Sequence, residues 1–173
     1  MTREELITQA VLQALKEKEQ KSPASASDYT PYTKKMTLKL AKILVERIEE
    51  KAKEWGMKIV VAVSDDRGRI IAIHCMDGCF YGSYEVAVNK TYTATAFQMP
   101  TKKLADLCKP GGDLYGLQFG NDGKVMILGG GEPLYIGDTL IGALAVSGDT
   151  AQMDTKLGEY GVEVFKEVTN GCR

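Results

Sequence analysis

The segment at residues 59–76, IVVAVSDDRGRIIAIHCM, decides the fold class of this chain. Residues 59–63 are mostly β-branched, which predicts a short strand, and residues 69–76 predict a second strand. Between them lies DDRG at 65–68, a sequence typical of a tight turn. Two strands joined by a tight turn pair antiparallel, so we expect a β-hairpin here.

Helical patterns lie on both sides of this hairpin. Over 37–55 the apolar side chains recur on one stripe, with Thr37 as the expected N-cap and Gly56 as the expected C-cap. Good-to-neutral helix formers fill 83–98, and Pro100 fits a helix that ends just before it. We therefore expect one helix before the hairpin and one after it.

The remaining chain predicts two more helices and three strands. Thr101 is the expected cap of a short helix over 102–108, and Asp149 with Gln152 is expected to cap the last helix. The strands are expected at 125–128, 134–136 and 139–146, and the last two form a second hairpin. The order α-ββ-αα-βββ-α, with successive strands joined by tight turns, predicts an α+β fold rather than a doubly wound one.

The first 35 residues differ from this domain. Residues 1–21 predict an amphipathic helix, and residues 22–35 begin with small residues typical of a flexible linker. The apolar face of the helix consists of Leu6, Ile7, Ala10, Val11, Ala14 and Leu15. Its polar face carries as many acids as bases and it has no aromatics, which favours a protein partner over a membrane surface. The folded domain is then expected over 36–173.

Composition limits the classes of function. The formal net charge of −1 argues against broad nucleic-acid binding, which needs a basic surface. No apolar run approaches the length of a membrane span, and no export signal precedes the four cysteines. Reduced thiols in a cytoplasmic protein are therefore expected.

Two motifs invite a ligand-binding interpretation that their context does not favour. The glycines at 129–131 precede a strand rather than a helix, so we interpret them as a tight bend, with close approach to a ligand or subunit as the alternative. His74 and Cys75 point to opposite faces of a strand, and Cys79 has no second ligand pair elsewhere, so no structural metal is expected.

The sequence motifs, taken together, resemble a known family. They are MDG at 76–78, NKTYTATAFQMPT at 89–101, PGGDLYG at 110–116, GGGEP at 129–133 and VSGDTAQMD at 146–154. This combination resembles the haem-degrading, HbpS-like or GlcG-type domain, and the C-terminal domain of PduO-type proteins. The resemblance runs from about residue 36 to the last helix.

This resemblance implies a profilin-like domain with a five-stranded antiparallel sheet flanked by helices, assembled into homo-oligomers. It also implies a tetrapyrrole ligand, haem or a corrinoid such as cobalamin. At the start of the first domain helix, where an axial histidine could sit in PduO-type relatives, this chain has Met36 and Thr37. Histidine ligation would then fall to His74, the only histidine, unless a methionine substitutes.

The N-terminal helix has a resemblance of its own. Its pattern E-E-L-I-x-x-x-V-x-x-x-L, followed by a small-residue linker, is similar to the encapsulation peptides of bacterial microcompartment cargo. The resemblance implies cargo that contacts a shell or cargo protein through residues 1–21. The protein is then expected inside a microcompartment in the cytoplasm.

We therefore predict an oligomeric tetrapyrrole-binding protein. The predicted ligand site combines polar groups, an aromatic ring and exposed backbone at Lys90, Tyr92, Phe97, Gly111, Gly112, Gly130 and Gly131. Lys90 is expected to pair with an acidic group of the ligand. Two alternatives stay open: an enzyme that acts on a small cofactor or metabolite through Lys90 or Glu85, and a structural or scaffolding oligomer.

Overall fold

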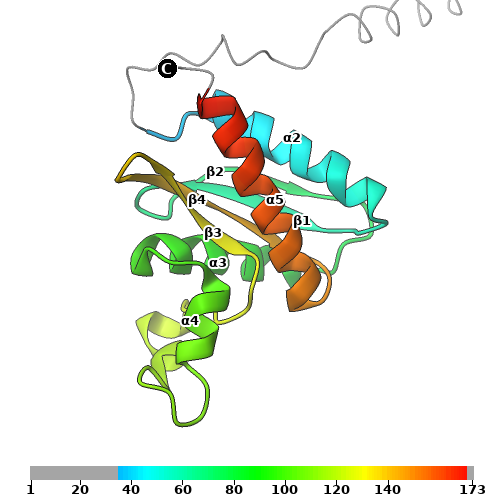
Figure 1. Cartoon of the computed structure of the whole chain (residues 1–173). Coiled ribbons are helices and arrows are strands. Elements are labelled where there is room, and N and C mark those ends of the chain that lie inside the picture. Colours follow the sequence, from blue (N-terminus) through cyan, green and yellow to red (C-terminus); the bar gives the residue numbers. More distant parts are fainter. Residues whose placement is uncertain (1–34, 171–173) are drawn as a thin grey trace, which may run out of the picture.

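The computed structural model describes residues 35–170, so the predictions for residues 1–21 and for most of the linker lie outside the described residues. Figure 1 shows a central sheet with helices on both faces. Helices α2 (Leu38–Glu54) and α5 (Ala151–Asn170) cover one face. Helix α3 (Ser83–Phe97) covers the other, and α4 (Thr101–Leu107) follows it on that side.

The sheet consists of two neighbouring hairpins. Strands β1 (Val60–Asp65) and β2 (Ile70–Cys75) form the first, and β3 (Gly131–Ile136) and β4 (Thr139–Ser147) form the second. Their order is β2-β1-β4-β3, and β1 pairs antiparallel with β4 to join the hairpins. The predicted α+β class and both predicted hairpins are confirmed.

The prediction of a fifth strand is wrong, because the described residues form a four-stranded sheet and 125–128 is not a strand. This segment runs beside α3 and α4 instead. The Met126 N–H donates to Thr93 Oγ1 at 2.8 Å, and Val125 packs with Leu104 and Cys108. A side chain thus satisfies the Met126 backbone donor, and α4 covers the Val125 side chain, so the segment needs no partner strand.

Helix α2 begins as predicted, with the Thr37 hydroxyl accepting the Leu40 N–H at 3.2 Å. Its end is also as expected, because Gly56 follows with a φ of 69° in the left-handed region. The described residues form no helix that combines the length and the apolar character needed to cross a membrane.

The two other predicted caps are wrong. Thr101 lies inside α4, where its hydroxyl accepts the Gly131 N–H at 3.0 Å. At the start of α5 the capping acceptor is the Thr150 hydroxyl, which takes the Met153 N–H at 3.2 Å. The Asp149 carboxylate instead accepts the N–H of Thr150. The Thr150 hydroxyl thus caps α5, whereas the Thr101 hydroxyl makes a tertiary contact instead of a cap. Local spacing in the sequence does not distinguish these two uses of a hydroxyl.

The core lies mainly between the sheet and the α2–α5 layer, which together bury one large apolar cluster. A smaller cluster on the opposite face contains Val60, Ala62 and Ala87. Cys79, which follows β2, packs against this smaller cluster. The apolar cluster on the α3 face of the sheet is therefore the smaller of the two. It extends to Cys79, just before α3.

Candidate functional site

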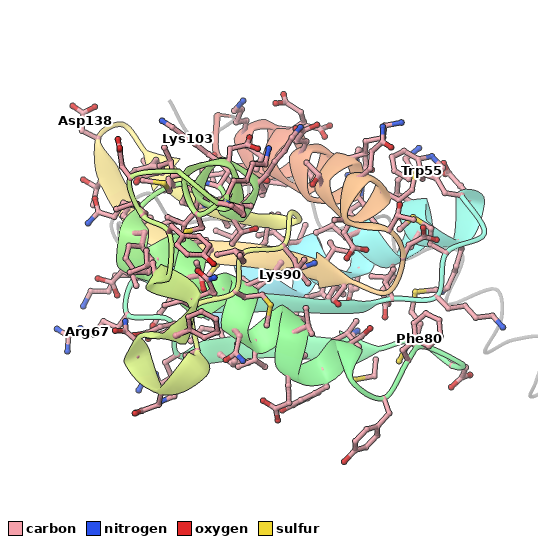
Figure 2. All side chains as sticks on the ribbon, turned by 90° about the horizontal axis from the view of Figure 1, so that it is seen from below. Trp55, Arg67, Phe80, Lys90, Lys103 and Asp138 are labelled. Carbon is pink, nitrogen blue, oxygen red and sulfur yellow. The ribbon has the colours of Figure 1, made fainter. Side chains whose placement is uncertain are left out.

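Lys90 lies in the interior of the molecule, between α3 and the sheet (Figure 2). Its side chain is 1% exposed, and its Nζ donates to Asp154 Oδ2 at 2.8 Å and to the Val146 carbonyl oxygen at 2.7 Å. Burial lowers the pKa of Lys90 and raises the pKa of Asp154, and the ion pair opposes both shifts. The acidic partner of Lys90 in this chain is thus Asp154, so pairing with a ligand stays a prediction that requires displacement of this carboxylate.

Gly130 and Gly131 pack directly against this ion pair. A Cβ on Gly130, whose φ is 106°, would lie 2.8 Å from the Asp154 Cβ and 2.9 Å from the Val146 carbonyl oxygen. A Cβ on Gly131 would lie 2.9 Å from the Lys90 carbonyl oxygen. The glycine run is therefore a close backbone approach to helices of the same chain. Three of the seven predicted site residues come together here, around a buried ion pair.

The other four predicted site residues lie in different surroundings. The Tyr92 hydroxyl accepts a hydrogen bond from Asn121 Nδ2 at 2.9 Å, and Phe97 packs on the cluster around Leu104. Gly111 and Gly112 lie in the turn that follows α4. The structure therefore places the predicted residues around the ion pair, in two further surroundings along α3 and in the turn that follows α4.

An apolar pocket of about 410 Å³ lies where β2 leads into α3. Its wall is lined by Val60, Cys75, Cys79, Phe80, Tyr81, Gly82, Tyr84 and Glu85. The Phe80 ring is 72% exposed and Tyr81 is fully exposed, although both are large aromatic side chains. A concave, mainly apolar wall with a few polar groups is typical of a small-molecule site. We refer to this hollow as the aromatic pocket.

Sequence reasoning missed the aromatic pocket. The available signal was FYGSY at 80–84, which places three aromatic rings within five residues where a helix begins. Phe80 and Tyr81 precede the helix predicted at 83–98. Hydrophobic periodicity does not apply to such a loop, so it could not predict that these two side chains are exposed. Of the aromatic-pocket residues, Glu85 was a candidate for the enzymatic alternative, and Cys75 and Cys79 were considered only as metal ligands.

A larger hollow, of about 550 Å³, lies at the turn of the first hairpin. Figure 2 shows Arg67, which lines this hollow, at the opposite end of the molecule from Phe80. Its wall carries both charge signs, and Arg69 Nε pairs with Asp65 Oδ2 at 3.1 Å. This second site is suited to a small polar ligand rather than to an apolar ring system.

Two thiols, those of Cys75 and Cys79, line the aromatic pocket. Burial, followed by the neighbouring Cys79, raises the pKa of Cys75. Within the described residues, Cys75, Cys79 and Cys108 are free thiols. His74 points to the other face of the sheet, where its Nδ1 lies 3.2 Å from Glu49 Oε1 of α2. In residues 35–170 no three His, Cys, Asp or Glu side chains are grouped as metal ligands.

Glu132 is a buried acid outside both hollows. It lies in β3 and is 6% exposed. Burial raises its pKa to about 7, with a further contribution from the charge of Glu159 and an opposing one from Lys102. Such a group changes charge near neutral pH, so it couples the stability of this region to pH.

Comparison with known proteins finds a matching family model and several relatives in sequence. The model of the family "Haem degrading protein HbpS-like" matches residues 36–163. An uncharacterized 15.0 kDa protein from the dhaT-dhaS intergenic region of Citrobacter freundii is 36% identical over 133 residues, which are 77% of this chain and 94% of that protein. Corrinoid adenosyltransferase PduO of Salmonella typhimurium is 33% identical over 121 residues, which are 70% of this chain. The chain spans only 36% of PduO.

A solved structure extends the comparison to a ligand complex. The crystal structure of the PduOC:haem complex has a TM-score of 0.72 to this chain at 29% identity. The match covers 75% of this chain and 94% of that one. A protein of this fold therefore binds haem.

Proposed function

The chain belongs to the family of haem-degrading HbpS-like proteins, and from this premise we propose that it binds a haem-type tetrapyrrole in the aromatic pocket. The observation that carries the proposal is the apolar hollow between β2 and α3, with its exposed aromatic rings. The haem complex of PduOC, a protein of the same fold, supports the choice of ligand class.

The residues of the aromatic pocket fit such a ligand. Phe80, Tyr81 and Tyr84 offer π-faces for contact with a flat macrocycle, and their exposure leaves room for one. The pocket also contains thiol and phenol groups, both of which serve as axial ligands in haem proteins. A bound haem would supply a redox-active iron. The residues of this chain would hold the ring, exclude water from one face and offer a donor atom.

Titration of the full chain with haemin tests this proposal through the Soret band. We expect saturable binding of one haem per chain, weakened about tenfold by Tyr84→Ala, since a lost aromatic contact costs about 1.4 kcal/mol. Tyr115→Ala is the matched control, because this tyrosine is also exposed but does not line the aromatic pocket. Equal affinities of the two variants would place the site elsewhere.

Cobalamin is titrated in parallel, because the sequence left haem and a corrinoid as alternatives. A spectral change with cobalamin and none with haemin would replace the proposed ligand. No change with either compound would refute tetrapyrrole binding. For the enzymatic alternative, Lys90 is already paired with Asp154, so Glu85 in the wall of the aromatic pocket is its remaining candidate.

We further propose that the protein is cargo of a bacterial microcompartment, addressed by residues 1–21. The support is the amphipathic pattern of that segment and its resemblance to encapsulation peptides. A fluorescent protein fused to residues 1–27 is expected to concentrate with co-expressed shell proteins. The chain that lacks residues 1–27 is expected to stay diffuse. A substitution of Leu6 and Leu15 by glutamate is the control that keeps the length. Encapsulation of the shortened chain would refute the address.

A homo-oligomer is also part of the proposal. The support is the exposure of several large aromatic side chains in one chain, which a partner copy would cover. These side chains are Trp55, Phe119 and Tyr135, which lie outside the aromatic pocket. Light scattering after gel filtration measures the mass of the full chain. A monomer at micromolar concentration would refute this part.

A further inference from the structure

We propose that the free edge of β2 is a surface through which two copies of this chain pair, antiparallel and about a two-fold axis, so that their four-stranded sheets join into one. This inference rests on the homo-oligomer of the proposed function and deepens it, because it names a contact and its symmetry. It does not depend on the tetrapyrrole, so each of the two is tested separately.

β2 is an edge strand with an open side. In the order β2-β1-β4-β3 it pairs only with β1 among the described residues. The backbone groups that face away from β1 therefore have no partner strand, and such a row is a template for pairing with another chain. Residues 70–74 are half-buried and Cys75 is exposed, so the helices on the two faces of the sheet leave this edge accessible.

The sequence of β2 lacks the features by which edge strands avoid pairing. Its six residues, IIAIHC, include no proline, glycine, lysine, arginine, aspartate or glutamate. The other edge strand, β3, contains two such features: Pro133, which has no N–H to donate, and the buried acid Glu132. Both hairpins contain a register shift, so an irregularity does not distinguish the two edges. β2 is thus the edge that is open to a partner, whereas β3 is protected.

A second copy of the chain is the partner that fits this edge. Because β3 is protected, sheets do not add edge to edge without end, and β2 against β2 closes as a two-fold dimer. Arg69 and Asp77 each lie four residues from Ile73, on opposite sides of it. The Arg69 side chain is 80% exposed, and Asp77 is exposed. An antiparallel pair centred on Ile73 brings each arginine toward the aspartate of the other copy, whereas a parallel pair would bring like charges together.

The hollows of the molecule adjoin the same strand. The hollow at the hairpin turn includes Arg69 and Ile71, and the aromatic pocket includes Cys75. A third hollow, of about 480 Å³, includes Cys75 and Asp77. Ligand pockets form preferentially where two folded units meet. In the antiparallel pair, the hairpin turn of one copy approaches the end of β2 of the other, so the second copy would extend the wall of the aromatic pocket.

Disulfide cross-linking of the full chain tests the contact directly. In an antiparallel pair, the Cα atoms of opposite residues are about 4.5–5.5 Å apart, which a disulfide spans. We expect Ile73→Cys, made together with Cys75→Ser to remove the exposed neighbouring thiol, to form a covalent dimer on mild oxidation. Asp138→Cys in the same background is the matched control, because it lies in the exposed turn between β3 and β4 and should cross-link far less.

Charge reversal gives a second readout that keeps β2 intact. Asp77→Arg should weaken the dimer about tenfold in sedimentation equilibrium, because it places an arginine toward Arg69 of the other copy. Added salt should reduce this difference. Asp138→Arg is the control for the same change of charge at the other edge and should leave the dissociation constant unchanged. Circular dichroism of each reduced variant checks that it is folded.

The outcomes separate this contact from the homo-oligomer on which it rests. A folded wild type that is monomeric at micromolar concentration would refute both. An oligomer in which Asp138→Cys cross-links as readily as Ile73→Cys, or in which Asp77→Arg associates as tightly as the wild type, would overturn the β2 contact alone. A monomer in which the thiol of Ile73→Cys resists iodoacetamide would mean that residues 1–34 cover the edge, which also overturns the contact.

Discussion

Replacement of Glu132 by glutamine should make the protein less sensitive to pH between about 4.5 and 7. The folded state raises the pKa of this carboxyl from 4.5 to about 7, mainly because it is buried. Below pH 4.5 both states hold the proton, so the stability linked to it is fully present. As the pH rises through 7 this stability is lost, because the unfolded state ionises more easily. At 1.36 kcal/mol per pKa unit, the loss is at most about 3 kcal/mol.

Urea denaturation followed by circular dichroism measures this effect. The wild type should lose stability over that pH range relative to Glu132→Gln, and the difference between the two should grow by about 3 kcal/mol. The glutamine keeps the shape of the side chain but carries no charge at any pH. Glu159→Gln should give a smaller pH dependence than the wild type, because Glu159 adds to the raised pKa while Lys102 opposes it.

Glu163→Gln is the control for a change of charge on α5, since this residue is exposed and pairs with Lys166. It should leave the pH dependence of the wild type unchanged. Parallel stability curves for the wild type and Glu132→Gln would refute the reasoning. They would mean that Glu132 ionises in the folded protein as easily as it does in the unfolded chain.

The remaining predictions concern the interior and one surface pair. Lys90→Met should cost about 3–5 kcal/mol of unfolding free energy because it leaves Asp154 buried without its partner, and Lys90→Met with Asp154→Leu should recover most of that loss. Gly130→Ala should cost at least about 1–3 kcal/mol, since its φ of 106° is strained for alanine and the new Cβ meets Asp154, whereas Gly82→Ala has open space and should change the free energy far less. Arg69→Ala should cost under about 1 kcal/mol, because the arginine of its pair with Asp65 is largely exposed. Thermal or urea unfolding measures all three.

Local signals in the sequence were sufficient for the hairpins and the start of α2. DDRG at 65–68 and the largely β-branched runs on both sides of it specify an antiparallel pair without help from distant residues. Thr37 caps α2 through a contact three residues away, which spacing alone can predict. These features are encoded within a few residues, so the tertiary structure does not override them.

The errors occur where a distant partner decides the outcome. Residues 125–128 have strand propensity, but Thr93 takes the Met126 N–H from 33 residues away. Thr101 looks like a cap, yet its hydroxyl accepts the N–H of Gly131, 30 residues further on. In both cases a threonine hydroxyl accepts a backbone N–H from a segment that is distant in the sequence. The residues next to the threonine do not indicate that partner.

The predicted ligand site around Lys90 can be considered in the same physical terms. A lysine among polar helix residues, with glycines nearby, has the features of a site for an acidic ligand, because both need a counter-charge and space for close approach. A buried lysine needs the same two things from its own protein, and here Asp154 and Gly130 provide them. The aromatic pocket lacks such an internal partner: Phe80 and Tyr81 remain exposed within the described chain. Exposed apolar side chains are the more informative sign of binding, because burying them against a ligand lowers the free energy. A buried lysine that is already paired with a carboxylate gains less from a ligand, because the ligand must first displace that carboxylate.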